Sequence, residues 1–363
     1  MSNNISIFNV GNTNYKKGNY PLFLGEGLAL LDTINKPHPK LFALYEQQMA
    51  FGWKWNEVNL SQDRMDMTKA PKEVVDLMVD TLLYQWHIDS VAANGIIQLF
   101  SPFISSSVLA SLFTEITRME VIHAHSYSHI IQQTMQDPHK ALEKAMTLQS
   151  SLDRGEGIVS WFDKLATMGA KLRLGMVKKD DGEVVDTVIM AMVNLYILEQ
   201  LSFISSFAVT FAISELGYFQ GIGRLVGLIC RDEWHVHAAA DKLIVEELKE
   251  VYPKHFKRLQ PQILKMISDA VTTEKTWNNY LFSNRTCVGL TETLLNEWVD
   301  YMAQYIYSTI GVDSPVEIKR NPLPYMNYYL DPNSTQIAAQ ESDLSSYQLD
   351  SIADDLDGDI LDF

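Results

Sequence analysis

Hydrophobic residues recur at helical spacing along most of this chain. Segments in which apolar side chains return every three or four positions lie at about 40–52, 70–100, 107–134, 139–171, 186–216, 220–250, 254–283 and 289–311. Most of these segments are longer than the average helix of about 11 or 12 residues, and few turn-rich or alternating stretches separate them. The pattern predicts an all-α fold built as a bundle of long helices.

One short segment departs from the helical pattern. Residues 176–185, Met-Val-Lys-Lys-Asp-Asp-Gly-Glu-Val-Val, place Asp181-Gly182 between two short apolar pairs. An Asp-Gly pair suits the tight turn of a β-hairpin, because both residues adopt a positive φ there readily. We therefore expect a small β-hairpin as an excursion from the bundle.

Composition narrows the class of protein. With 363 residues and 47% hydrophobic content, the chain can bury a large core in one domain or two. The first residues lack the regions of a signal peptide, and two cysteines are too few for a disulfide framework, so we expect a cytoplasmic protein. A net charge of −16 argues against nucleic acid as the main partner, since phosphate binding needs basic clusters.

The end of the chain differs in composition from the rest. We expect the folded domain to span 1–325 and a flexible acidic tail to span 326–363. Residues 341–363 carry eight acids and no Lys or Arg, which is half of the net charge. Such a segment buries too little apolar surface to offset the entropy of ordering. Because it ends in Asp-Ile-Leu-Asp-Phe, it is either a tail that docks on a partner or a solvated tail with incidental hydrophobic residues.

A long apolar run contains a single ionisable side chain. Between Asp186 and Glu215, the only Asp, Glu, Lys, Arg or His residue is Glu199. The run is long enough to cross a membrane, but it contains several Asn, Gln, Ser and Thr residues and no second run accompanies it, so we expect a buried central helix. A buried carboxylate is neutral, ion-paired or bound to metal. Asp89 interrupts the apolar run 74–100 in the same way.

A carboxylate, an imidazole and a phenol share one face of a predicted helix. Glu120, His123 and Tyr127 are spaced i, i+3 and i+7, which is two helical turns. Carboxylate and imidazole groups bind divalent redox metals, and a phenol one turn away is close enough to be oxidised. The spacing therefore predicts a redox metal site.

A second predicted helix concentrates the same chemistry. Its sequence Arg-Asp-Glu-Trp-His-Val-His, at 231–237, holds two carboxylates and two imidazoles. Bundles that bind two metals commonly use one Glu from each of two helices and a Glu-x-x-His pair from each of two others. The matching residues are Glu120 with His123, the single carboxylates Asp89 and Glu199, and Glu233 with a nearby His. Four carboxylates and two divalent ions sum to zero charge, which makes such a buried cluster tolerable.

Four motifs follow one another in a recognisable order. They are Tyr84-Gln-Trp-His-Ile-Asp89-Ser, Glu120-Val-Ile-His-Ala-His-Ser-Tyr127, Leu198-Glu199-Gln-Leu-Ser-Phe203-Ile-Ser-Ser-Phe207 and Arg231-Asp-Glu233. With them the chain resembles the small, radical-generating subunit of class I ribonucleotide reductase. The resemblance covers about 20–325 and extends to the tail pattern Gln340-Glu-Ser-Asp-Leu-Ser-Ser-Tyr347. It implies a ferritin-like helical bundle.

The resemblance implies a set of metal ligands. For two metal ions per chain these are Asp89, Glu120, His123, Glu199, Glu233 and His237. The family has Arg-Asp-Glu-x-x-His, whereas here Val236 stands at the third position after the Glu, between His235 and His237. The downstream sequence fits best with His237 as the ligand and His235 as the alternative. One extra residue would then be absorbed as a π-bulge, which is common at functional sites. Iron is the implied metal, with manganese or a mixed pair as alternatives.

The resemblance also implies a route for a radical. Tyr127 would hold a stable tyrosyl radical inside an apolar pocket formed by Phe203, Phe207 and Ile229. The residues implied to transfer the radical are Trp53 in Phe51-Gly-Trp-Lys-Trp, Asp232 as its link to His123, and Tyr347 in the tail.

The implied function is one half of an enzyme. The metals would activate O2 with the help of an external reductant, and the oxidised centre would remove an electron and a proton from Tyr127. A separate large subunit, docked through the tail, would use the radical to reduce ribonucleotides to deoxyribonucleotides. The small subunit would be a homodimer, with no nucleic-acid or membrane partner. Two alternatives stay open, namely a dimetal oxidase or hydroxylase with its own substrate, and a non-catalytic subunit that organises a partner around a degenerate metal site.

Overall fold

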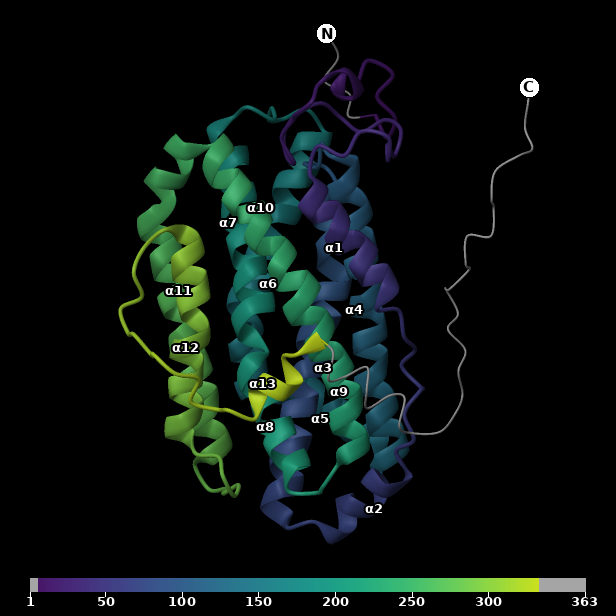
Figure 1. Ribbon diagram of the computed structural model, residues 1–363, viewed down its shortest axis with the longest axis vertical. Coiled ribbons are helices and arrows are strands. Elements are labelled where there is room, and N and C mark those ends of the chain that lie inside the picture. The colour runs from purple at the N-terminus through teal and green to yellow at the C-terminus, as the bar shows by residue number, and fades with distance from the viewer. Residues whose placement is uncertain (1–5, 333–363) are drawn as a thin grey trace, which may run out of the picture.

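Long helices lying side by side form most of the protein, whose computed structural model describes residues 6–332. In chain order they are η1 (Asn14–Lys16), α1 (Pro39–Ala50), α2 (Ser61–Lys69), α3 (Lys72–Phe100), α4 (Ser107–Thr134), α5 (Pro138–Thr147), α6 (Gln149–Arg173), α7 (Gly182–Ile197), η2 (Leu198–Ser202), α8 (Ile204–Glu215), α9 (Gln220–Asp232), η3 (Glu233–His237), α10 (Ala238–Val251), α11 (Pro253–Phe282), α12 (Glu292–Ile310) and α13 (Met326–Tyr329). The longest helices run along the long axis of the molecule (Figure 1). The expected all-α bundle is confirmed.

Helices α3 and α4 pack against each other along their lengths. The short connection 101–106 joins them, and the Ser106 hydroxyl accepts a hydrogen bond from the Leu109 amide, which caps α4. A short connection makes the two helices antiparallel neighbours. Residues equally far from the connection therefore lie at similar heights, which brings Asp89 near Glu120.

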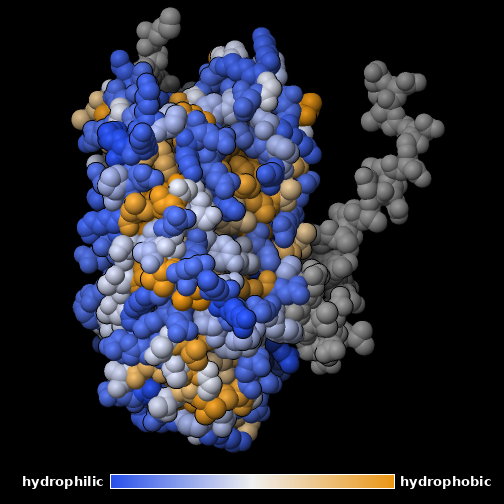
Figure 2. Space-filling model, turned by 60° about the vertical axis from the view of Figure 1, so that its left-hand side comes forward, coloured by the Kyte–Doolittle hydropathy of each residue, from blue (hydrophilic) through white to orange (hydrophobic). Residues whose placement is uncertain are grey.

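The apolar run predicted as a core helix is buried. It extends over Gly182–Glu215, and 94% of its most apolar stretch is buried inside the protein. Helix α7 packs on α6, α10 and α11, and α8 packs on α3 and α9. On the face that Figure 2 shows, several hydrophobic patches are separated by hydrophilic residues. The run is therefore the core helix of a bundle.

Two local expectations were wrong. No hairpin forms at 176–185, because the Asp181 carbonyl accepts the Val184 amide and α7 begins directly after it. The Asp181 carboxylate accepts a hydrogen bond from the Lys178 amide, so this residue ends a turn and starts a helix. The segment expected as one helix at 139–171 is two, because Leu148, with ψ of 97°, separates α5 from α6.

The N-terminal segment before α1 packs across one end of the bundle (Figure 1). The Ser105 amide donates to the Leu22 carbonyl over 2.8 Å, and the Leu22 amide donates to Glu247 Oε1 on α10 over 2.9 Å. Burial raises the pKa of Glu247 to about 7, and the nearby Glu250 adds to the shift. The N-terminal segment is thus held by the Glu247 side chain, whose ionised form is disfavoured by burial.

Candidate dimetal and radical site

Four regions of the bundle bring six polar side chains into its interior. They are Asp89 from α3, Glu120 and His123 from α4, Glu199 from η2, and Glu233 and His237 from η3. Each of these residues is at most 4% exposed to solvent. Buried carboxylates need a cation or a hydrogen-bond donor, so their meeting point is a candidate metal centre.

The helical spacing in α4 has the predicted effect. Glu120 and His123 point from the same face of the helix, and His123 Nδ1 lies 3.6 Å from Glu120 Oε2. The same nitrogen lies 2.9 Å from Glu233 Oε1, which comes from η3. His123 Nδ1 therefore faces carboxylate oxygens of two different helices.

The extra residue after Glu233 forms the predicted π turn. Residues Glu233–His237 are π-helical between α9 and α10, which continue in helical conformation on either side. His237 points inward, with Nδ1 2.8 Å from Glu120 Oε1 and 3.0 Å from Glu233 Oε2. His235 points elsewhere, because its Nε2 donates a hydrogen bond to the Leu330 carbonyl over 2.9 Å. Of the two histidines, His237 is the one in the cluster.

The six residues form two overlapping groups, and within each group one donor atom per residue lies within 4.8 Å of the others. One group is Asp89, Glu120, His123 and Glu233, and the other is Glu120, Glu199, Glu233 and His237. Both carboxylate oxygens of Asp89 and the Nε2 atom of His237 are buried without a hydrogen-bond partner among residues 6–332. Oxygen and nitrogen donors left in this state suit divalent ions. The residues fit two ions that share Glu120 and Glu233.

The pKa values of the cluster reflect its crowded charges. Burial, and then the neighbouring carboxylates, raise the pKa values of Asp89 and Glu199 well above their ordinary range. Burial alone would also raise the pKa of Glu233, but His237 and its other partners hold it well below its usual value. The pKa values of both imidazoles are well above normal, because the facing carboxylates outweigh the effect of burial. The cluster thus favours positive charge between its carboxylates.

Tyr127 lies on the same face of α4 and is buried. Its side chain is 0% exposed, and its hydroxyl has no hydrogen-bond partner in the part of the chain that the structure describes. Burial, and then the negative charge of Asp89, raise the pKa of Tyr127 well above its ordinary value. The three residues predicted to form its pocket, Phe203, Phe207 and Ile229, are also buried. The rings of Phe203 and Phe207 stack on each other with their centroids 5.6 Å apart.

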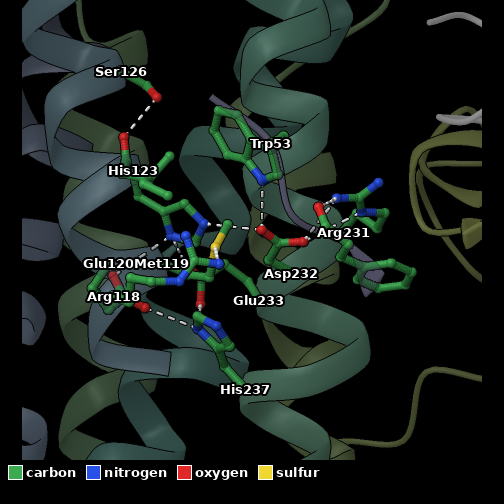
Figure 3. Close-up of polar contacts among 12 residues, drawn as sticks. Trp53, Arg118, Met119, Glu120, His123, Ser126, Arg231, Asp232, Glu233 and His237 are labelled. Atoms are coloured by element: carbon green, nitrogen blue, oxygen red, sulfur yellow. Dashed lines mark hydrogen bonds and ion pairs between the residues drawn. The ribbon is translucent and has the colours of Figure 1, made fainter. Parts of the chain in front are cut away.

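A hydrogen-bonded path leads away from His123 (Figure 3). Asp232 Oδ2 accepts a hydrogen bond from Trp53 Nε1 over 2.7 Å and lies 3.3 Å from His123 Nε2. Arg231 holds the other oxygen of Asp232 at 3.1 Å and donates to the Phe51 carbonyl. Trp53 and His123 also stack, with ring centroids 5.8 Å apart. The predicted link between Trp53 and His123 is therefore present, whereas Tyr347 lies outside the described residues.

Two buried groups around the cluster escaped the sequence interpretation. Asp241 is 1% exposed, and burial raises its pKa well above normal. Its position four residues after His237 is a signal that could have been noticed. The Arg154 guanidinium donates two hydrogen bonds of 2.6 Å to the Glu274 carboxylate and one of 2.7 Å to the Ser202 carbonyl. The last of these holds the end of η2. No local pattern indicates that pair, because its members come from α6 and α11.

Comparisons with known proteins agree with this arrangement. The family model for the small chain of ribonucleotide reductase matches residues 32–322. The chain belongs to this family. The small chain is 26% identical over 356 residues to ribonucleoside-diphosphate reductase 1 subunit beta of Escherichia coli O157:H7, with 94% of each chain covered. The small chain is thus an oxidoreductase subunit that works with a separate large subunit.

Solved structures show the same fold for the small chain. The ribonucleotide reductase R2 subunit from Clostridium botulinum matches with a TM-score of 0.78 at 19% identity, covering 90% of this chain and 98% of that one. The dimanganese(II)-NrdF of Streptococcus sanguinis matches with a TM-score of 0.66 at 14% identity, covering 85% of this chain and 100% of that one. The ferritin-like architecture of the small chain is therefore confirmed.

Proposed function

We propose that this small chain binds two metal ions and uses them with O2 to form a stable tyrosyl radical on Tyr127. The proposed ligands are Asp89, Glu120, His123, Glu199, Glu233 and His237. The observation that carries the proposal is the pair of overlapping donor groups that share Glu120 and Glu233. A buried tyrosine lies on the same helix face as the α4 ligands, which supports one-electron chemistry beside the metals.

Iron is the proposed metal. The carboxylate and imidazole donors equally suit manganese or a mixed pair, and one structural relative is named for two manganese ions. Bound together with O2 and an external reductant, the metal pair would supply an oxidant that takes one electron from a phenol. The remaining chemistry belongs to the residues of this chain.

Tyr127 enters the reaction as a neutral phenol, because its raised pKa keeps the hydroxyl protonated. It therefore loses a proton from Oη together with an electron, and becomes a neutral radical. The carboxylates whose charges act on Tyr127 belong to the cluster, with Asp89 the first among them, so we propose that the proton leaves toward the metal site. Burial of Phe203 and Phe207 keeps water and reductants away from the radical.

The radical must then reach the large subunit. Trp53, Asp232 and His123 provide a hydrogen-bonded path from the cluster toward the surface. We propose that Tyr347, in an acidic tail that docks on the large subunit, continues this route. We further propose that the small chain is a cytoplasmic homodimer.

Replacing Tyr127 with Phe tests the proposal. The ring stays, so metal content should remain at about two ions per chain after anaerobic loading with iron and exposure to air. The tyrosyl signal in electron paramagnetic resonance should disappear, because the phenol oxygen is gone. Tyr196→Phe is a matched control, since Tyr196 is 1% exposed and its hydroxyl contacts Thr309 instead.

Each alternative function has its own outcome. A full radical signal in Tyr127→Phe would contradict the assignment, because the radical would then lie on another residue. Absence of a tyrosyl signal in the unaltered, metal-loaded protein would favour an oxidase or hydroxylase that stores no radical. Absence of bound metal in the unaltered protein would favour a partner-organising subunit with a degenerate site.

A further inference from the structure

The last described residues form a clasp on the outside of the bundle. We call residues 321–332 the C-terminal clasp; it includes α13, which lies against α8 and α9 (Figure 1). Met326 is 1% exposed, so the clasp contributes to the core. The family model ends at residue 322, so nearly all of the clasp lies beyond the matched region.

One side of the clasp is fixed to the helix that follows η2. Tyr325 donates from its hydroxyl to the Ala208 carbonyl over 2.8 Å. Tyr329 stacks on Phe211 with ring centroids 3.8 Å apart and an interplanar angle of 4°, and its hydroxyl donates to Glu215 over 2.9 Å. These contacts hold the clasp from the α8 side.

The other side of the clasp is fixed to the metal-binding turn itself. His235 Nε2 donates to the Leu330 carbonyl over 2.9 Å. His235 lies midway between Glu233 and His237, which both face the cluster. Beside this contact, Trp234 and Leu330 line a cavity of about 330 Å³ that continues between the clasp and α12.

The π turn explains why such a contact exists. In a regular α-helix the two members of a Glu-x-x-His pair, with two residues between them, share one face, and the π turn adds one residue between Glu233 and His237. The added position lets the backbone present His237 inward and His235 outward from one short segment. The extra residue between Glu233 and His237, which the family lacks, thus occurs in the turn whose His235 contacts Leu330, a residue beyond the region that the family model matches.

We propose that His235 is a positioning residue that couples the C-terminal clasp to the turn carrying Glu233 and His237. Holding Leu330 fixes η3 in the orientation seen here, and release of the clasp loosens it. Coupling of this kind is reciprocal, so metal binding should in turn tighten the clasp. That consequence rests on the proposed function, whereas the mechanical coupling does not. A partner that engages the chain beyond the clasp would act on the site through His235.

Hydrogen exchange of the full-length protein, read by mass spectrometry, tests the coupling without metal. In His235→Ala, backbone amides of 323–332 and of 233–240 should exchange about 3- to 10-fold faster, as expected for loss of one hydrogen bond. His235→Gln, whose amide can still donate, should recover most of the protection. Unchanged exchange at 233–240 in His235→Ala would overturn the proposal.

A double-mutant cycle separates coupling from general loosening. Tyr329→Phe keeps the ring stack but removes the hydrogen bond to Glu215, so it should weaken the attachment of the clasp to α8. Exchange at 233–240 should rise in Tyr329→Phe when His235 is present and should not rise further when His235 is already Ala. Equal additive effects in both backgrounds would refute the coupling.

Titration with Mn(II) provides an independent readout. The dissociation constant should increase about 3- to 10-fold in His235→Ala and return toward the original value in His235→Gln. If the unaltered protein binds no Mn(II) or Fe(II), the proposed function fails, while the exchange experiment still decides the coupling. Unchanged Mn(II) affinity in His235→Ala, with wild-type binding intact, would contradict the role of His235 at the site.

Discussion

Deleting His235 tests whether the π turn absorbs one added residue within a continuous helix. The deletion restores two residues between Glu233 and His237, so η3 can close as a regular helical turn between α9 and α10. We expect α10 to keep its orientation and its buried face to stay buried. The cluster should still bind metal, because both ligands remain on one helix face.

The structure sets the size of the two possible outcomes. A deletion that is not absorbed rotates α10 by about 100° and turns Ile244, Val245 and Leu248 away from the core, where each is now at most 1% exposed. At about 1.5–3 kcal/mol per side chain, the loss would be about 5–9 kcal/mol, comparable to the whole stability of a typical domain. An absorbed deletion loses mainly the His235 hydrogen bond, about 0.5–1.5 kcal/mol.

Denaturant unfolding of the metal-free protein distinguishes these outcomes. Deletion of Thr272 is the matched control, because this exposed residue lies in α11, where no π turn can absorb the change. We expect the His235 deletion to unfold close to the parent and the Thr272 deletion to be severely destabilised. Equal losses in the two deletions would refute the idea that η3 holds an inserted residue.

Three further predictions follow from contacts described above. Trp53→Phe keeps an aromatic side chain but removes the Nε1–H that donates to Asp232, so radical formation should persist while turnover with the large subunit falls about 10- to 100-fold in a ribonucleotide reduction assay. The pKa of Glu247 is raised to about 7 in the folded state, so the parent protein loses stability as the pH rises toward 7 and this carboxyl ionises. Glu247→Gln removes that ionisation, so the stability of the variant relative to the parent should increase by about 1–2 kcal/mol from pH 5.5 to 8.5 in urea unfolding. A stability difference that does not change with pH would contradict this. Arg154→Met should cost about 3–5 kcal/mol by leaving Glu274 buried and unpaired, and adding Glu274→Leu should recover most of the loss in the same assay.

The sequence predicted the parts of the site that depend on spacing within a helix. Glu120, His123 and Tyr127 share a face because helical periodicity alone places them there. The π turn was also predictable. Compared with the family pattern Glu-x-x-His, one extra residue stands between Glu233 and His237, and a helix that continues on both sides must absorb it locally. Asp89 and Glu199 were predicted as partners from their lone positions in apolar runs and the ligand pattern of dimetal bundles, because periodicity alone does not say how helices pack.

Other features depend on tertiary contacts that no local pattern carries. Leu148 breaks a helix without a Gly or Pro beside it, and the contact between Ser151 at the start of α6 and His87 on α3 is visible only in the fold. An Asp-Gly pair is common both in hairpin turns and at the start of helices. At Asp181-Gly182 the chain starts a helix, α7. The contact between His235 and Leu330 joins positions 95 residues apart, and no local pattern indicates it.

The buried helix that supplies Glu199 has a consequence for how the chain is made. On a ribosome, Gly182–Glu215 emerges before α10 and α11, the later helices that cover α7. Until they follow, the nascent chain exposes a segment as apolar as a membrane span. Expression of a fragment that stops at residue 219 should therefore yield aggregated or membrane-associated material, whereas the full chain hides the segment on its own. Assembly of the candidate metal cluster thus waits for α10 and α11, which shield the helical segment that carries Glu199 from water.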